Sequence, residues 1–393
     1  MNTAFVPAGK PRDVRLDVVR GLALMTIFIN HVPGNPLEQF TSRNFGFSDA
    51  AEAFVLMSGM AVALAYSKGF FRGEWRKTAG RMLARARTLY VVHVVTMSLA
   101  LVIVGTGLLL CGTAQVAGQV NFTRLQIDGL KAVLGIPLLG YQIGYFNILP
   151  LYVVLLVSAI AFLAIGVRHV GAMLALSASL WVLAHLTGIN LPNWPGDWGW
   201  FLNPFGWQLV FVAGIAIGLG VVTGRPPVRR HPGLLAFAWA FVIFSAVWVR
   251  LGMGAVPGLA ALPALFADTD KGALAFLRLV HVLALAYVVI HTGWIGKALS
   301  GAALRPVATI GRNGLAVFAA GSLLAIVLQV LFEAWPAGPW QRSVLIAMGL
   351  GAHYLVALLF DRRKAPRGQG ARSPALPLAA GKPAEPARPP VPG

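Results

Sequence analysis

The chain has few charged residues and almost no cysteine, and both shortages limit the classes of protein to which it can belong. Only 11% of its 393 residues are charged, whereas 57% are hydrophobic, and the mean hydropathy is +0.73. This apolar content exceeds what a soluble domain of this length can bury. The single cysteine, Cys111, cannot form an intramolecular disulfide or a cysteine metal cluster. The composition therefore predicts a polytopic membrane protein.

Several functional motifs are also missing. The eight histidines show none of the spacings typical of metal ligands, so we expect no metal site. The sequence has no glycine-rich phosphate loop, no dinucleotide fingerprint and no internal repeat, and we expect no bound cofactor. The N-terminal stretch "MNTAFVPAGKPRDVR" lacks the apolar core of a signal peptide, so we expect no cleaved leader.

Acidic residues are scarce, with 13 Asp and Glu against 32 Lys and Arg, which gives a net charge of +19. The stretches long and apolar enough to cross a membrane are 16–33, 51–67, 89–110, 147–166, 172–188, 205–222, 234–250, 274–295, 311–333 and 343–360. With the N-terminus inside, cytoplasmic segments hold 24 basic residues and outer segments seven. This asymmetry follows the positive-inside rule. We therefore expect an all-α polytopic membrane protein with about ten transmembrane helices, both termini cytoplasmic and no nucleic-acid partner.

The connecting segments complete this organisation. Residues 126–140 are too short and interrupted to cross, and indicate a helix at the outer interface. The aromatic cluster in the outer loop 189–204 is typical of a membrane boundary, with an aromatic wall for a sugar ring as the alternative. Residues 361–393 are rich in Pro and basic residues, so we expect a disordered cytoplasmic tail beside anionic lipid. The rest, 1–360, is one transmembrane domain.

Ionisable side chains inside a membrane are costly, so each is a candidate for function. Arg20 and His31 stand eleven positions apart, which places them on one helical face about 16 Å apart. Arg20 has a simpler interpretation, in which it extends to the inner interface and pairs with Asp17. His31 is harder to explain in that way, because it lies far along the span and Pro33 ends the helix just beyond it.

The second span begins with two carboxylates, Asp49 and Glu52. Their three-residue spacing is that of a capping box, which is sufficient to explain Asp49. Glu52 lies about one turn inside an otherwise apolar helix, at a depth similar to that of His31. A carboxylate facing an imidazole fixes its tautomer and raises its basicity, which is what a general base needs.

These residues carry a resemblance to a known family. The Arg20 to His31 spacing followed by "FVLMSGM" resembles the acyltransferase 3 superfamily of membrane acyltransferases, and within it the chain is similar to the OpgC proteins, from about residue 12 to 360. The stretches that carry this similarity are "RDVRLDVVRGLALMTIFINHVPGNP", "RNFGFSDAAEAFVLMSG", "PLLGYQIGYFNILPLYVVLL", "NPFGWQLVFVAGIAIG", "DKGALAFLRLVHVLALAY" and "IGRNGLAVFAAGSLLA". Two positions depart from the pattern: Asn147 stands where the family has Asp, and Gly314 where related acyltransferases often have Ser.

The resemblance implies a multi-pass protein of the bacterial inner membrane that transfers an acyl group, expected to be succinyl, from cytosolic acyl-CoA to hydroxyls of an osmoregulated periplasmic glucan. Acyl-CoA is then a donor substrate, not a bound cofactor. Membrane lipid, the glucan and proteins of glucan synthesis are the expected partners. Arg20 at the inner end of the first span, and Arg312 at the start of the ninth, are candidates for binding the donor's phosphates, with a purely topological role for Arg312 as the alternative.

The implied mechanism assigns the outer-side residues. His31 accepts the proton of the sugar hydroxyl, oriented by Glu52 or, second, by Asp49; a covalent acyl-histidine is the alternative. The further candidates for substrate binding are polar residues near the outer side. The oxyanion donors among them are Asn147, Gln208 and Asn44; Arg43 is a general substrate contact; and Arg278 with His281 is either a carboxylate site or a helix-packing pair.

Two other classes of function fit the same residues. Intramembrane Arg, His and Glu also suit a secondary transporter or flippase for an anionic or sugar-linked substrate. Such transporters are often built from inverted repeats, and the sequence shows none. A structural partner in a glucan-synthesis complex is the third class.

Overall fold

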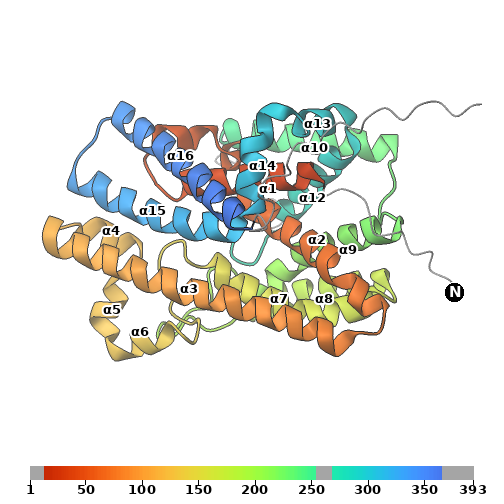
Figure 1. Ribbon diagram of the computed structural model, residues 1–393, viewed down its shortest axis with the longest axis horizontal. Coiled ribbons are helices and arrows are strands. Elements are labelled where there is room, and N and C mark those ends of the chain that lie inside the picture. Colours follow the sequence, from red (N-terminus) through yellow and green to blue (C-terminus); the bar gives the residue numbers. More distant parts are fainter. Residues whose placement is uncertain (1–12, 254–267, 365–393) are drawn as a thin grey trace, which may run out of the picture.

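The computed structural model describes residues 13–253 and 268–364, which fold into helices and form no β-strand (Figure 1). The prediction of an all-α polytopic membrane protein is confirmed. The expected tail lies almost entirely in 365–393, outside the described residues.

Eight helices in the described part of the chain are long and apolar enough to cross a membrane. They are α2 (Ala50–Phe71), α3 (Trp75–Cys111), α7 (Ile148–Gly166), α8 (Val170–Thr187), α9 (Pro204–Thr223), α10 (Pro232–Arg250), α15 (Gly314–Ala334) and α16 (Pro339–Lys364). The pair α12 (Phe276–His291) and α13 (Gly293–Leu299) makes a ninth if it is one span, bent by 84°. The first helix, α1 (Val14–Asn30), has only 17 residues. Every predicted stretch overlaps one of these helices.

The boundaries differ from the prediction in four places. Helix α3 begins at Trp75 instead of 89, because the basic stretch before the apolar run is also helical. The stretch 274–295 is broken at Thr292. Arg312 does not begin the ninth span; it ends α14 (Arg305–Arg312), and α15 follows after Asn313. Helix α16 continues past 360, where Asp361 accepts hydrogen bonds from Arg312 (3.0 Å) and Asn313 (2.7 Å).

Short helices fill the connections. Two single-turn 3-10 helices, η1 (Pro36–Phe40) and η2 (Ser42–Asn44), lie between α1 and α2. The predicted interfacial helix at 126–140 is instead two short helices, separated at Gly129, whose φ of 47° interrupts the helical path. The remaining short elements are α4 (Ala114–Gln119), α5 (Thr123–Asp128), α6 (Leu130–Gly135) and η5 (Ala302–Leu304).

Glycines allow two helix pairs to approach closely. A Cβ on Gly59 of α2 would collide with the Phe211 carbonyl of α9, and one on Gly214 would collide with the Leu56 carbonyl. Helices α1 and α14 meet in the same way, because a Cβ on Gly311 would collide with the Asp17 carbonyl. Membrane helices commonly use small residues for such contacts. Helix α1, which carries Arg20 and ends at His31, and helix α2, which begins with Asp49 and Glu52, are thus each packed closely against a partner helix.

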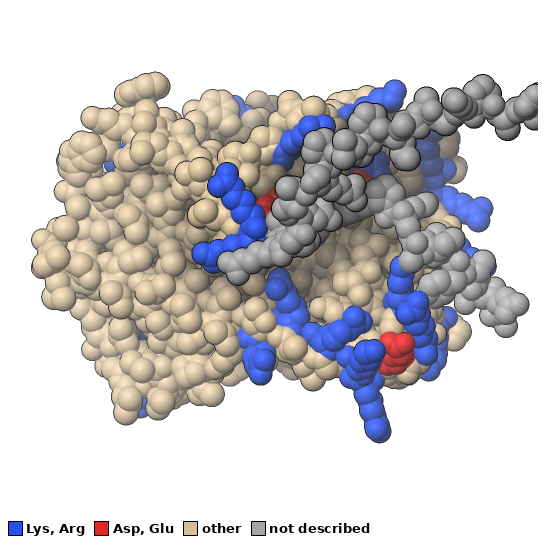
Figure 2. All heavy atoms as spheres, viewed as in Figure 1, with Lys and Arg blue, Asp and Glu red and all other residues tan. Residues whose placement is uncertain are grey.

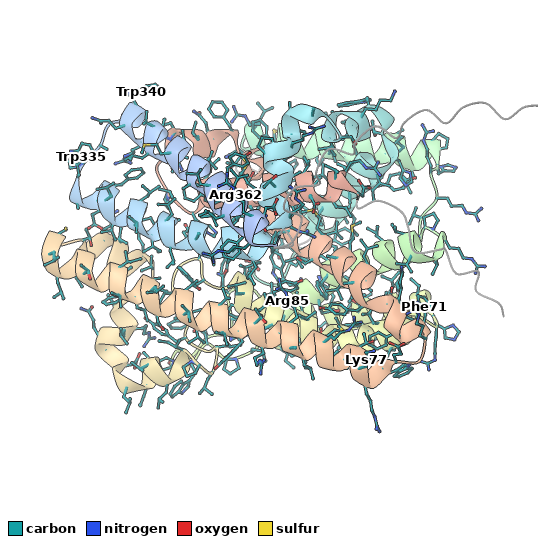
Figure 3. All side chains as sticks on the ribbon, in the orientation of Figure 1. Phe71, Lys77, Arg85, Trp335, Trp340 and Arg362 are labelled. Carbon is teal, nitrogen blue, oxygen red and sulfur yellow. The ribbon has the colours of Figure 1, made fainter. Side chains whose placement is uncertain are left out.

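Charge distinguishes the two ends of the bundle. Blue side chains gather on one half of the face in Figure 2, whereas the other half is largely uncharged. Lys77 and Phe71 lie toward the basic end, and Trp335 and Trp340 lie at the opposite end (Figure 3). We call these the inner and outer ends, following the orientation that the positive-inside rule predicts.

The aromatic loop 189–204 has both buried and exposed members: Trp200 is buried, and Trp198 is 48% exposed.

Candidate active site

His31 occupies the C-terminal end of α1, where its backbone N–H donates to the Ile27 carbonyl at 2.9 Å. Its own carbonyl accepts a 2.6 Å hydrogen bond from the Gln329 side chain of α15. The half-buried imidazole stacks on the Tyr145 ring, with centroids 4.3 Å apart and planes 10° from parallel. Among the described residues, no hydrogen bond occupies either ring nitrogen. Hydrogen bonds to the His31 backbone and the stacked Tyr145 ring therefore fix the position of the imidazole. Both of its ring nitrogens remain available to bond to a substrate.

Tyr145 belongs to the loop between α6 and α7 and was not singled out from the sequence. Burial raises the pKa of its hydroxyl, so the group is protonated at neutral pH and can donate a hydrogen bond. Asn147, two residues on, is half-buried at the N-terminal end of α7 and makes no side-chain capping bond there. Tyr145 is thus the side chain of this loop that the structure places against His31, and Asn147 follows two residues along the chain.

A buried ion-pair network joins α2 to α12. Asp49 caps α2 by accepting from the Ala51 N–H at 2.7 Å, and Glu52 accepts from the Asp49 N–H at 2.9 Å, as the capping box predicts. Glu52 is fully buried, and its Oε1 lies 2.6 Å from Arg278 Nε. Asp49 Oδ2 accepts from Lys271 Nζ at 2.6 Å and lies 3.5 Å from Arg278. Each of these four charges has an opposite partner within the network.

This network changes the expected role of Glu52. The prediction that Glu52 contacts His31 is wrong in this structure, because its two oxygens are used by Asp49 and Arg278. The charged groups within electrostatic range of His31 are Asp49 and Lys271. Asp49 is therefore the carboxylate that influences the imidazole, without a direct hydrogen bond to it.

Arg278 and His281 do not form a shared anion site. Arg278 is committed to Glu52 and Asp49. His281 Nδ1 accepts from the Ser48 backbone N–H at 3.2 Å and lies 2.6 Å from the Ser48 hydroxyl. Because Nδ1 is an acceptor, the ring proton is on Nε2, which is buried with no hydrogen-bond partner in the described chain. This arrangement matches the packing interpretation of the pair.

Two of the expected substrate contacts are used within the fold. The Gln208 amide is buried between α8 and α9, where it accepts from the Ser177 hydroxyl at 2.5 Å and donates to the Ser177 carbonyl at 2.7 Å. Asn44 donates to the Glu38 carbonyl at 2.8 Å. Both N–H groups of Gln208 are used, because its amide also donates to the Phe205 carbonyl at 3.2 Å, whereas Asn44 uses one of its two N–H groups. Arg43 pairs with Glu38 but is 45% exposed, so it can still reach a ligand.

The two expected phosphate-binding arginines differ in their surroundings. Arg20 is largely buried, lies 3.7 Å from Asp17 and packs its stem beside Gly314, where a Cβ would lie 3.4 Å from Arg20 Cδ. Arg312 is partly exposed and bonds to Thr309 at 2.9 Å and Asp361 at 3.0 Å, which links α14 to α16. The geometry gives Arg312 a helix-pairing role.

A pocket of about 430 Å³ opens beside the ion-pair network, and we call it the outer pocket. It is lined by Arg43, Gly46, Phe47, Ser48, Asp49, Trp248, Val249, Gly252, Thr269 and Arg278. These residues come from the loop before α2, the end of α10 and the start of α12. Of the six residues expected from the sequence to contact substrate, two, Arg43 and Arg278, line the pocket.

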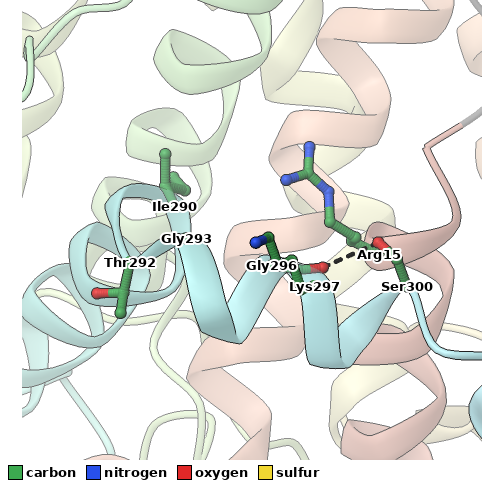
Figure 4. Close-up of a pocket in the computed structure, with 7 residues that line it drawn as sticks. All are labelled: Arg15, Ile290, Thr292, Gly293, Gly296, Lys297 and Ser300. Atoms are coloured by element: carbon green, nitrogen blue, oxygen red, sulfur yellow. Dashed lines mark hydrogen bonds between the residues drawn. The ribbon is translucent and has the colours of Figure 1, made fainter.

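A second pocket, of about 440 Å³, lies at the inner end between α1 and α13 (Figure 4). Arg15 and Lys297 line it, and the Ser300 hydroxyl donates to the Gly296 carbonyl at 2.9 Å. The Arg15 guanidinium, hydrogen-bonded to Asp13, holds the pKa of that carboxyl below its usual range. This pocket contains neither Arg20 nor Arg312.

No group of three or more metal-ligating side chains is present in the described ranges.

Comparison with known proteins identifies the family to which the chain belongs. A model of the family described as OpgC protein matches residues 12–365. Searches of curated proteins and of solved structures returned no match. The OpgC family name suggests an acyltransferase that modifies a glucan. The match covers both ends of α1, the network and the outer pocket, and the chain belongs to the OpgC family.

Proposed function

We propose that the protein transfers an acyl group, expected to be succinyl, from cytosolic acyl-CoA through the membrane to a hydroxyl of a periplasmic glucan, with His31 as the general base. The observation that carries this proposal is the His31 imidazole, stacked on Tyr145 with both ring nitrogens uncommitted, on the same helix as Arg20. The bacterial inner membrane is the proposed location.

His31 removes the proton from the sugar hydroxyl as its oxygen attacks the thioester carbonyl. The new C–O bond forms, the C–S bond breaks, and the proton passes to the departing CoA thiolate. General-base catalysis of this kind contributes roughly 100- to 10,000-fold to a rate. Tyr145 stacks on the ring and Gln329 bonds to the His31 backbone carbonyl, and these contacts take the place of the carboxylate contact expected from the sequence.

The developing oxyanion needs a hydrogen-bond donor. The Tyr145 hydroxyl, protonated because burial raises its pKa, and the Asn147 amide are the donors that the fold brings to this region. Both stand in one loop, so a single segment supports the imidazole and the reacting carbonyl.

Arg20 would contact the donor at the other end of α1. Its guanidinium is partly exposed near Asp17, and a cation there can form charge-assisted hydrogen bonds with phosphate. The pantetheine arm of CoA would then extend along the bundle towards His31. This arrangement explains why one helix carries a cation at one end and an imidazole at the other.

The test measures transfer of a labelled acyl group from acyl-CoA to glucan in membranes that contain the wild type, His31→Ala or His185→Ala. His185 lies exposed near the outer end of α8 and serves as the matched control. We expect His31→Ala to lose at least about 100-fold in rate at unchanged abundance, and His185→Ala to match the wild type. More than about a tenth of wild-type turnover in His31→Ala would rule out the general base.

A further inference from the structure

The outer pocket has the chemistry of a site for a neutral sugar. Its volume of about 430 Å³ lies within the range of roughly 300–1,000 Å³ that small-molecule sites occupy. The wall contains a large aromatic side chain, Trp248, together with fixed hydrogen-bonding groups on Asp49, Arg278 and Ser48. Aromatic area combined with a few placed polar groups is the usual composition of such sites.

The charged residues that line the outer pocket are each paired with an opposite charge. Arg43 pairs with Glu38, Lys271 with Asp49, and Arg278 with Glu52. Because each cation already has a carboxylate, an incoming anion would have to displace one or lie beside it. The pocket is therefore poorly suited to a succinyl carboxylate or a CoA phosphate, which disfavours the carboxylate site that the sequence left open at Arg278. A polyol can donate to Asp49 and accept from Arg278 without disturbing either ion pair.

The aromatic wall is held in place by its neighbours. The Trp248 ring contacts Phe244, with centroids 5.5 Å apart, and Phe47 at 6.3 Å. Arg278, which also lines the pocket, is only 9% exposed and is fixed by two carboxylates. Both the apolar and the polar sides of the pocket are thus built before any ligand arrives.

The outer pocket shares charged residues with the electrostatic surroundings of the candidate base. Asp49 lines the pocket and is one of the two charged groups that act on His31. Arg43 lines it too and acts electrostatically on Tyr145, the ring on which His31 stacks. A ligand bound in the pocket would therefore contact residues that act electrostatically on His31 and Tyr145.

We propose that the outer pocket binds one neutral sugar unit of the acceptor glucan, with Trp248 stacking on the sugar ring and Asp49 and Arg278 bonding to its hydroxyls. This inference rests on the proposed function for the identity of the acceptor. The pocket is therefore an acceptor site, separate from the donor's contact at Arg20.

The experiment measures the Kd of a short unsubstituted glucose oligosaccharide for the full-length protein in lipid nanodiscs by saturation-transfer NMR. Trp248→Ala should weaken this binding about tenfold, whereas Trp248→Phe, which keeps an aromatic face, should recover most of it. The matched control is Trp340→Ala, an exposed outer-end tryptophan outside the pocket, which should bind like the wild type. Trp248→Ala should also raise KM for glucan and leave KM for acyl-CoA unchanged.

Each other result is decisive. An unchanged Kd for the oligosaccharide in Trp248→Ala, or no binding by the wild type, overturns the acceptor site whether or not transfer occurs. Displacement of the sugar by succinate would assign the pocket to a carboxylate. Sugar binding that depends on Trp248 in a protein without acyl transfer would leave the site standing and disprove the proposed function. A parallel rise in both KM values would identify a folding defect in Trp248→Ala. Trp248→Leu, which keeps apolar bulk and removes the aromatic face, then decides: a Kd weaker than that of Trp248→Phe supports the site, and equal Kd values in the two variants contradict it.

Discussion

Two polar clusters lie at the outer end of the bundle, and they differ in how far their hydrogen-bonding capacity is used. In the α2–α12 network, Glu52 and Arg278 are buried and paired with each other, and Asp49 pairs with Lys271. In the His31–Tyr145 pair, the rings stack and the ring nitrogens of His31 have no hydrogen bond within the described residues. The first cluster has the features of a structural element, and the second has the features of a reactive one.

The difference predicts opposite responses to mutation. Removing a partner from the paired cluster leaves a buried charge, which costs stability. Removing a group from the stacked pair leaves little unsatisfied, so the loss should appear in the chemistry. The following variants test this contrast, from the largest expected effect to the smallest.

Arg278→Ala should lower the abundance of folded protein in the membrane, because it leaves Glu52 buried without its cation. Breaking a buried pair in this way costs about 3–5 kcal/mol. Thermal unfolding in detergent and membrane immunoblotting measure the effect. The double variant Arg278→Leu with Glu52→Leu should regain much of the lost stability, because it removes both charges. Normal stability in Arg278→Ala would show that the pair is not structural.

Tyr145→Phe should keep the stacked ring and remove only the hydroxyl. We expect a fall in the rate of acyl transfer of roughly 100-fold if this hydroxyl is the main oxyanion donor, with abundance unchanged. The measurement is kcat at saturating donor and acceptor. Asn147→Ala in the same assay shows which of the two donors serves the carbonyl. A wild-type kcat in both variants would remove this loop from the mechanism.

Arg20→Ala should weaken the binding of the donor acyl-CoA and leave the binding of the acceptor glucan unchanged. Loss of one charge-assisted contact costs roughly 1.5–3 kcal/mol, which corresponds to about 10- to 150-fold in the affinity for acyl-CoA. Arg20→Lys should retain part of that affinity. The measured quantity is KM for acyl-CoA beside KM for glucan, and an unchanged KM for acyl-CoA would leave Arg20 with the topological role alone. Arg312→Ala is the comparison, since its pairing with Asp361 predicts a small effect on donor affinity.

The positions of the membrane helices could be predicted from the sequence, whereas their exact boundaries and the contacts between them could not. Long apolar runs fix the spans because an unpaired backbone is too costly in lipid. The break at Thr292 and the early start of α3 at Trp75 were missed because hydropathy does not register a bend or a basic helical extension. The capping box of Asp49 and Glu52 is local, and it was predictable for that reason.

The site residues were found where the signal is local and missed where it depends on folding. His31 and Arg20 are recognisable from their spacing on one helix. The pairing of Glu52 with Arg278, and of His31 with Tyr145, joins segments far apart in the chain, so no spacing rule reveals it. Tyr145 lies within "YFNILPLY", part of one of the stretches that resemble the family, and this is the one hint of its importance in the sequence.

The central claim is that the acyl group crosses the membrane within this protein, and sidedness tests it most directly. Sealed inside-out membrane vesicles with glucan enclosed receive labelled acyl-CoA on the outside, which is the cytoplasmic face. Gln39→Cys in a Cys111→Ser background reports the orientation, because residue 39 is exposed at the outer end and Cys111 is the one native thiol. The account predicts labelled glucan inside the vesicles and none with His31→Ala. Labelling only when donor and glucan share one face would contradict it.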